Sequence, residues 1–218
     1  MFSLKYTQNF FTNSGKVKLI LANQDSSLPT LEIGGGHGEF SKFLKPHSII
    51  LEKDIELATN LKKYYPKLNI YNVDFFDFEL PDFDYQVLSN LPFAFTSEIL
   101  TKLMKNSHFQ YGVFIVQKEV AEMFMGVFRN NLKSIVYQNY FGFDILMDLS
   151  KNDFKPKPSV ETQVIRISRI KNPLICGNME LIKFEKLVRE IGKARIGEGD
   201  FLKYIRKNLR LYTVICIN

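Results

Sequence analysis

The feature that most constrains the fold of this chain is the regular alternation of apolar and helix-like segments along its first two thirds. Strand-like apolar segments lie at 30–35, 47–54, 68–74, 84–90 and 111–117, and helix-like segments lie at 38–44, 55–65, 97–104 and 118–126. Two more strand-like segments, 141–150 and 161–170, flank a proline-containing stretch. Such alternation is typical of a parallel β-sheet covered on both faces. The sequence therefore predicts an α/β fold that binds ligands at the carboxyl ends of its strands.

Composition narrows the class of protein. Hydrophobic residues make up 45% and charged residues 24% of the 218 residues, as in ordinary globular proteins. No apolar run reaches the roughly eighteen residues of a membrane-spanning helix, and the first residues lack the pattern of a secretory signal. We interpret Cys176 and Cys216 as free thiols of a reducing compartment, and the three histidines lack metal-ligand spacing. We expect no membrane, no metal, a monomer by default, and a cytoplasmic location with an organelle as the alternative.

Positive charge is concentrated in the last quarter of the chain. Residues 1–165 contain 17 basic and 18 acidic side chains, whereas residues 166–218 contain 12 basic and 5 acidic ones. Two segments of helical spacing also lie in this last quarter. We therefore predict a first domain at 1–170 and a short, basic, mainly helical appendage at 171–218. The appendage is interpreted as a tail that binds a polyanion, most simply RNA or DNA, with an affinity that falls with salt, and a solvated helical face is the alternative.

A glycine-rich turn, EIGGGHG at 32–38, follows the first predicted strand. Glycines such as Gly34 and Gly36 permit positive φ and let a ligand approach the backbone, and the helix-like segment that follows offers its first amide groups. The second predicted strand ends in Glu52, at a spacing where a carboxylate accepts both hydrogen bonds of a ribose diol. The alternatives are a turn with a purely structural role and a surface acid.

The spacing of these glycines differs from that of a dinucleotide-binding turn, because a single residue separates Gly38 from Gly36. A tighter turn suits a ligand without a pyrophosphate, such as S-adenosylmethionine. The third predicted strand ends in Asp74, whose carboxylate can accept the exocyclic amine of that cofactor's adenine. Polar groups at three successive strand ends therefore predict one site shaped for an adenosine moiety.

The fourth predicted strand ends in SNLPF at 89–93, directly before a helix-like segment. Adenine N6 is a poor nucleophile because its lone pair is delocalised into the ring. The Asn90 carboxamide oxygen and a backbone carbonyl near Leu91 and Pro92 can accept both N6 protons, so that positioning replaces a strong base. Pro92 fixes the backbone, and Phe93 offers a ring on which an extruded base can stack. The alternative is a strand-terminal turn with a core phenylalanine.

Seven motifs occur in a characteristic order: QNFF at 8–11, EIGGGHG at 32–38, LEKD at 51–54, NVDFFDF at 72–78, SNLPF at 89–93, VQKEVAEMF at 116–124 and FKPKPSVETQVIRI at 154–167. This order resembles that of the rRNA adenine N6-dimethyltransferases, over roughly residues 6–170. The resemblance implies a Rossmann-like class I methyltransferase sheet, S-adenosyl-L-methionine as the cofactor and rRNA as the partner. KsgA-type members modify paired adenosines near the end of small-subunit rRNA. Erm members modify one adenosine of large-subunit rRNA and confer macrolide resistance.

The resemblance also implies roles for individual residues. The implied cofactor contacts are Asn9, the backbone at Phe11, Gly34, Gly36, Glu52, Asp74 and Asn90. On the target side, Asn90 is implied to lie between cofactor and target amine, with Pro92 and Phe93 beside it. Phe154 is implied to close on the target base from the other side. A buried anchor for the loop at 156–160 is the alternative role of Phe154.

Three departures from the family pattern bear on the choice of target. Ser89 stands where glycine commonly precedes the asparagine, residues 130–141 lack the tyrosine-glycine pair of the KsgA branch, and the tail after Arg169 is short. The short tail and the segment EIGGGHGEF favour the Erm branch. The segments QKEVAEMF and FLKYIRKNLRL favour the KsgA branch, which we expect on balance.

We therefore predict an rRNA (adenine-N6)-dimethyltransferase that acts on small-subunit rRNA during ribosome biogenesis, within a pre-ribosomal small subunit. The alternatives are an Erm-type enzyme and a catalytically weak rRNA-binding assembly or transcription factor of the same fold. Intact Gly34, Glu52 and Asp74 favour catalysis, because a pure scaffold can lose them. A DNA adenine methyltransferase is disfavoured, since such enzymes usually carry an acidic residue at Asn90 and a second proline at Leu91.

Overall fold

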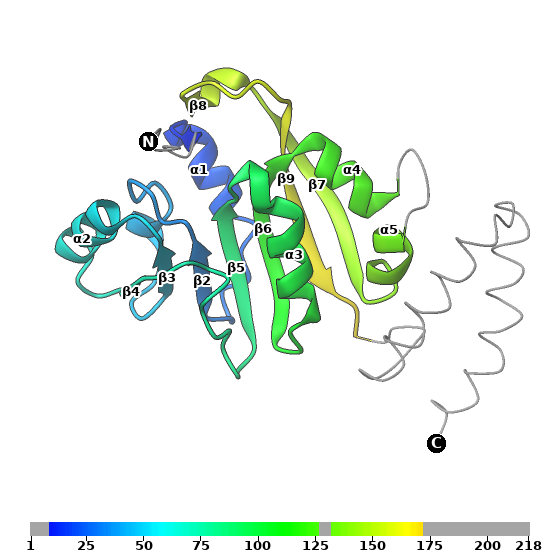
Figure 1. The fold of residues 1–218 in the computed structure, drawn as a ribbon, viewed down its shortest axis with the longest axis horizontal. Coiled ribbons are helices and arrows are strands. Elements are labelled where there is room, and N and C mark those ends of the chain that lie inside the picture. The colour runs from blue at the N-terminus through cyan, green and yellow to red at the C-terminus, as the bar shows by residue number, and fades with distance from the viewer. Residues whose placement is uncertain (1–8, 127–131, 172–218) are drawn as a thin grey trace, which may run out of the picture. The chain divides into compact units, whose positions relative to one another are not determined.

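The structure, a computed structural model, describes residues 9–126 and 132–171 (Figure 1). The strands are β1 (Phe10–Phe11), β2 (Thr30–Ile33), β3 (Ile49–Glu52), β4 (Asn69–Asn72), β5 (Tyr85–Asn90), β6 (Phe109–Gln117), β7 (Phe141–Leu149), β8 (Phe154–Lys155) and β9 (Thr162–Arg169). The α-helices are α1 (Ser14–Leu21), α2 (Ile55–Tyr64), α3 (Thr96–Lys105), α4 (Lys118–Met125) and α5 (Leu132–Tyr137). Short 3₁₀ turns are η1 (Ser41–Phe43), η2 (Phe93–Phe95) and η3 (Lys151–Asp153).

Seven strands form one sheet in the order β4-β3-β2-β5-β6-β9-β7. The neighbours from β4 to β6 are all parallel, and β9 is antiparallel to β6. This confirms the predicted α/β, Rossmann-like fold and the parallel arrangement of its first five predicted strands. The chain runs outward from β2 through β3 to β4 and returns to β5 on the other side of β2 (Figure 1). The carboxyl ends of β2 and β5 therefore mark the topological switch point, where ligands bind in open α/β sheets.

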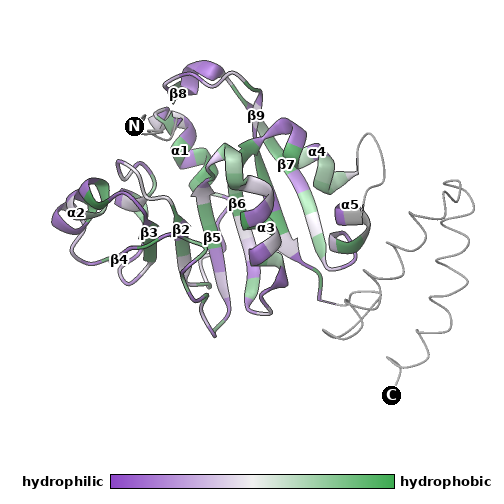
Figure 2. Cartoon of the chain, viewed as in Figure 1, coloured by the Kyte–Doolittle hydropathy of each residue, from purple (hydrophilic) through white to green (hydrophobic). Residues whose placement is uncertain are grey.

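The central strands are apolar along most of their length because both faces of the sheet are covered. Leu31, Ile50, Leu88 and Val113 on four neighbouring strands are completely buried. In Figure 2 the apolar colour runs along these strands, whereas α2 and α3 also carry hydrophilic faces. Helix α3 packs its apolar side, which includes Leu103, toward β6. The sheet is thus a rigid support for the loops at its carboxyl edge.

The helix expected at 38–44 is wrong, because only the short turn η1 forms there. Gly38 has φ +84°, which a right-handed helix cannot include. Pro46 follows so closely that only about two turns of chain remain after Gly38. The loop after β2 is therefore not followed by an α-helix whose first amide groups could face a ligand.

The described residues belong to two compact units, one comprising 9–121 and 143–168 and the other 122–126, 132–142 and 169–171. In the second unit the Phe124 and Tyr137 rings lie 5.9 Å apart, and Gln138 Nε2 donates to the Phe124 carbonyl. The predicted tail at 171–218 lies outside the described residues except for its first residue, so its helices and its RNA-binding role stay predictions. The predicted domain boundary at 170 stays a prediction as well.

Within the described ranges, no helix combines the length and apolar character needed to cross a membrane. Among the same residues, no three side chains of His, Cys, Asp or Glu gather in a way that would hold a metal ion.

Candidate active site at the carboxyl ends of the strands

The loop after β2 is shaped by its glycines. Gly34 and Gly36 adopt φ values of +74° and +53°, in the left-handed region that favours glycine. The N–H groups of Gly34 and Gly35 both donate to the Leu51 carbonyl, at 2.8 and 3.2 Å, which ties the loop to β3. A Cβ added at Gly34 would meet no atom within 4 Å. The space beside the backbone at this position is therefore open, and the predicted cofactor contact of Gly34 stays a prediction.

Glu52 at the end of β3 is buried and held by the backbone. Its Oε2 accepts the Gly36 N–H at 2.8 Å, and its Oε1 accepts the Asp54 N–H at 2.9 Å. Each carboxylate oxygen offers two lone pairs, so both retain acceptor capacity for another donor. Glu52 thus links the glycine loop to β3, a role that sequence reasoning missed. Its predicted contact with a ribose stays a prediction.

Asp74, two residues after β4, is ionised at neutral pH. Its Oδ2 accepts a hydrogen bond from Lys53 Nζ at 2.7 Å, and its Oδ1 accepts the Phe76 N–H at 2.9 Å. The hydrogen bonds from Lys53 and Phe76 outweigh the effect of burial and lower the pKa of Asp74. Asp74 is therefore a fixed acceptor at the strand end where the sequence predicts an adenine contact.

Asn90 ends β5 with a hydrogen bond on its carboxamide nitrogen and none from a described residue on its carboxamide oxygen. Its Nδ2 donates to the Asn9 carbonyl at 2.8 Å, while its buried Oδ1 receives a hydrogen bond from no described residue. A buried oxygen without a partner costs about 1–3 kcal/mol, so it calls for an explanation, and a catalytic role is one that this position at a strand end suggests. The Pro92 carbonyl is held by Phe95 N–H and Thr96 Oγ1. This leaves the Leu91 carbonyl as the candidate second acceptor.

Ser89, the departure from the family pattern, is used inside the sheet. Its buried Oγ donates to the Ile33 carbonyl, which joins the ends of β5 and β2. The hydroxyl group therefore braces the strand ends that carry Gly34 and Asn90.

The predicted aromatic residues come together next to Asn90. Phe93 is half-buried, and its ring meets the Phe154 ring edge to face at 6.4 Å. Phe154 is only 3% exposed and also packs edge to face against Phe11, at 5.4 Å. Phe154 is therefore a buried member of this aromatic cluster, and its role as an anchor for the loop at 156–160 remains an alternative. Closure of Phe154 on a target base stays a prediction.

The N-terminal segment lies over the glycine loop. Strand β1 pairs antiparallel with β8, so that Phe11 lies opposite Phe154. The Phe10 ring lies 4.4 Å from the His37 ring, and a Cβ at Gly36 would approach Phe10 within 3.2 Å. Sequence reasoning named Asn9 and Phe11 but missed Phe10, whose only signal was its place in QNFF.

A second group that sequence reasoning missed joins the loops after β4 and β5. Lys102 Nζ donates to three carbonyls of the first loop, those of Phe75, Phe76 and Phe78, at 2.9, 3.0 and 3.0 Å. The exposed rings of Phe76 and Phe95 meet edge to face at 6.1 Å. The loop that carries Asp74 is therefore fixed to the turn that follows Asn90.

Glu32 in β2 is a buried carboxyl group behind the glycine loop. Ser41 Oγ donates to its Oε2 at 2.6 Å. Burial raises the pKa of Glu32 to about 8, against the lowering effect of the Ser41 hydrogen bond, and the nearby Glu52 charge raises it further. Glu32 is therefore mostly protonated at neutral pH.

The raised pKa of Glu32 predicts a pH-dependent stability. The group has a pKa near 4.5 when solvated, so between about pH 4.5 and 8 the folded protein binds more protons than the unfolded chain. The stability that Glu32 contributes is complete below pH 4.5 and is lost as pH rises through 8. The Glu32→Gln side chain stays neutral at every pH. The free energy of unfolding of this variant, relative to that of the wild type, should therefore rise by on the order of 3 kcal/mol between pH 5 and 8.

Urea unfolding of both proteins at pH 5, 7 and 8.5 measures this difference. Glu56 is exposed, and Glu56→Gln is the control. Its free energy of unfolding plotted against pH should stay parallel to that of the wild type. If the free energy of unfolding of Glu32→Gln changes with pH in parallel with that of the wild type, Glu32 is ionised in the folded protein.

This chain is similar to known proteins over most of its length. The sequence profile of the ribosomal RNA adenine dimethylase family matches residues 1–195. Ribosomal RNA small subunit methyltransferase A of Malacoplasma penetrans (strain HF-2) is 32% identical over 197 residues, which are 85% of this chain and 70% of the relative. An rRNA adenine N-6-methyltransferase of Bacillus licheniformis is 29% identical over 65% of this chain and 52% of the relative. A dimethyladenosine transferase from Plasmodium falciparum has a similar fold, with a TM-score of 0.73 and 24% identity over 83% of this chain and 69% of that chain.

Proposed function

Because this chain belongs to the ribosomal RNA adenine dimethylase family, as its motifs predicted, we propose that it dimethylates adenosine N6 in small-subunit rRNA. The single structural observation that carries the proposal is the buried Asn90 Oδ1 at the end of β5, which no described residue satisfies. An acceptor at the topological switch point is what a reacting amine requires.

The small-subunit branch is favoured over the Erm branch by sequence identity and not by coverage. The small subunit methyltransferase A of Malacoplasma penetrans is 32% identical to this chain, against 29% for the N-6-methyltransferase of Bacillus licheniformis and 28% for that of Corynebacterium diphtheriae, which covers 91% of this chain. The proposed partner is therefore small-subunit rRNA within a pre-ribosomal particle. We propose the cytoplasm as the compartment, with a ribosome-containing organelle as the alternative.

The residues at the strand ends fit S-adenosylmethionine. When bound, this cofactor supplies a methyl group on a positively charged sulfur atom. The open backbone at Gly34 suits its methionine end, and the remaining lone pairs of Glu52 suit its ribose hydroxyl groups. The ionised Asp74 suits the exocyclic amine of its adenine.

The target amine is handled by the residues after β5. Asn90 Oδ1 and the Leu91 carbonyl accept the two N6 protons, which orients the amine and localises its lone pair. Phe93 is half-buried beside this point and supports the extruded base by stacking. No side chain has to act as a strong base, because positioning and hydrogen bonding raise the nucleophilicity of the amine.

The choice of substrate is tested with labelled S-adenosylmethionine and two acceptors. Unmodified small ribosomal subunits and protein-free large-subunit rRNA are incubated separately with the protein. We expect label only in the small subunits, near the 3′ end of their rRNA. Label only in the large-subunit rRNA would identify an Erm-type enzyme instead. No label in either acceptor, with cofactor still bound, would favour the assembly-factor alternative.

A further inference from the structure

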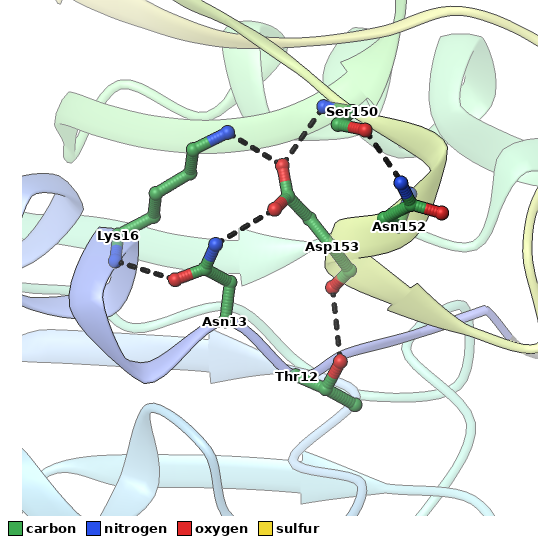
Figure 3. Close-up of polar contacts among 6 residues, drawn as sticks. All are labelled: Thr12, Asn13, Lys16, Ser150, Asn152 and Asp153. Atoms are coloured by element: carbon green, nitrogen blue, oxygen red, sulfur yellow. Dashed lines mark hydrogen bonds and ion pairs between the residues drawn. The ribbon is translucent and has the colours of Figure 1, made fainter.

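Asp153 is a buried carboxylate that the predicted site does not include. It ends η3, is 5% exposed, and its carboxylate accepts from three donors (Figure 3). Lys16 Nζ binds its Oδ2 at 2.6 Å, Asn13 Nδ2 binds its Oδ1 at 2.7 Å, and the Ser150 N–H binds its Oδ2 at 2.8 Å. Burial alone would raise the pKa of Asp153, but these hydrogen bonds outweigh burial and lower it. The carboxylate is thus charged and fully engaged.

The backbone of Asp153 binds the same segment as its side chain. Its carbonyl accepts the Thr12 N–H at 2.8 Å and Thr12 Oγ1 at 3.2 Å. Asn13 also caps α1, since its Oδ1 accepts the Lys16 N–H at 3.1 Å. One residue of η3 therefore fixes residues 12–16 at the start of α1, which lie some 140 positions away in the sequence (Figure 3).

This fixed segment leads directly to Asn90. Strand β1 immediately precedes Thr12 and pairs with β8, which immediately follows Asp153. At the outer end of this pair, Asn9 Nδ2 donates to the Pro156 carbonyl at 2.9 Å. The Asn9 carbonyl in turn accepts Asn90 Nδ2 at 2.8 Å. A continuous set of contacts therefore runs from the Asp153 carboxylate to the carboxamide of Asn90.

We propose that Asp153 is a positioning residue that orients the Asn90 carboxamide through β1. A carboxamide can rotate by half a turn and exchange its oxygen for its NH2 group. The Asn9 carbonyl accepts a hydrogen bond only from the NH2 group, so it keeps Asn90 Oδ1 on the opposite side of the carboxamide, where no described residue binds it. Asp153 holds this segment in place by fixing one end of the β1–β8 pair at Thr12, and the Asn9–Pro156 hydrogen bond closes the other end. Its effect on methylation rests on the proposed function, whereas its effect on Asn90 does not.

Two substitutions weaken this set of contacts to different extents. Asp153→Asn keeps the size of the side chain, but its NH2 group would face one of the three donors and its charge would be lost for Lys16. Lys16→Met removes a single contact and leaves the other two donors in place. Asp25→Asn is the control, because the Asp25 carboxylate likewise accepts hydrogen bonds, two from Ser27, but lies before β2 at the opposite end of the strand from Gly34.

The experiment reads out Asn90 directly and independently of activity. The side-chain amide resonances of Asn90 are assigned in the ¹⁵N-labelled full chain by their loss in Asn90→Ala. In Asp153→Asn these resonances should shift and exchange with solvent faster, and kcat should fall about 10-fold with an unchanged KM for rRNA. Lys16→Met should change both in the same direction and to a smaller extent. Asp25→Asn should change neither.

Unchanged Asn90 resonances in folded Asp153→Asn and Lys16→Met would overturn the proposal, even if activity fell. If Asp153→Asn does not fold, Lys16→Met alone decides between these outcomes. If the wild-type protein methylates no rRNA, the proposed function fails, and the resonances still decide whether Asp153 orients Asn90.

Discussion

Replacing Asn90 with alanine is expected to lower the rate of methyl transfer by about 100- to 1,000-fold. The substitution removes the buried Oδ1 that accepts the target amine, and Leu91 alone cannot orient both N6 protons. Cofactor affinity should fall only a few-fold, because Gly34, Glu52 and Asp74 remain. Single-turnover transfer of label to small subunits measures the rate, and equilibrium dialysis measures cofactor binding.

The matched control for this substitution is Asn69→Ala. Asn69 begins β4, is exposed, and donates to the His47 carbonyl at the amino edge of the sheet. Asn69→Ala should transfer methyl groups at the wild-type rate. Asn90→Ala should also bind small subunits as tightly as the wild type. Near-normal methylation by Asn90→Ala would refute its assigned role, and weakened subunit binding would instead make Asn90 an RNA contact.

Replacing Glu52 with glutamine is expected to weaken cofactor binding by about 10- to 100-fold. Both oxygens of Glu52 accept backbone N–H groups, from Gly36 and Asp54. Glutamine has a single oxygen, so its NH2 group would face one of these donors and displace the loop or the start of α2. The charge that strengthens hydrogen bonds to the ribose would also be lost, since a hydrogen bond to a charged group contributes about 1.5–3 kcal/mol and one to a neutral group about 0.5–1.5 kcal/mol.

Isothermal titration with S-adenosylmethionine checks this prediction, with Glu56→Gln as the control. Glu56 is exposed in the first turn of α2, so Glu56→Gln should bind the cofactor as tightly as the wild type. The melting temperature of each variant without cofactor separates a loss of contacts from a loss of fold. Wild-type affinity in a folded Glu52→Gln would show that Glu52 does not contact the cofactor.

Much of the fold was predictable because it follows from local patterns. Buried parallel strands are short and apolar, and the segments that end in Glu52 and Asn90 formed strands close to their expected bounds. The helix at 38–44 failed for a local reason as well, since the apolar spacing was present but Gly38 adopts a positive φ. Hydrophobic periodicity does not register the backbone conformation of a glycine.

The rest of the site depends on contacts between residues far apart in the chain, which a pattern within a short window cannot reveal. Asn9 and Asn90 were each named from their motifs, but their hydrogen bond across 81 positions was not. Asp153 had no signal beyond its place before Phe154, because an aspartate in a loop is usually solvated. The raised pKa of Glu32 likewise results from tertiary burial. An acidic residue within an apolar strand does not by itself tell whether its carboxyl group is buried or solvated.

The most direct test of the account is mass spectrometry of the nucleosides from small-subunit rRNA after incubation with the protein and S-adenosylmethionine. The account predicts N6,N6-dimethyladenosine with the wild-type protein and, at equal early reaction times, about 100- to 1,000-fold less with Asn90→Ala. Its absence from the wild-type reaction, under conditions in which the cofactor is bound, would contradict the central claim that the strand ends at Gly34, Glu52, Asp74 and Asn90 form a methyltransferase active site.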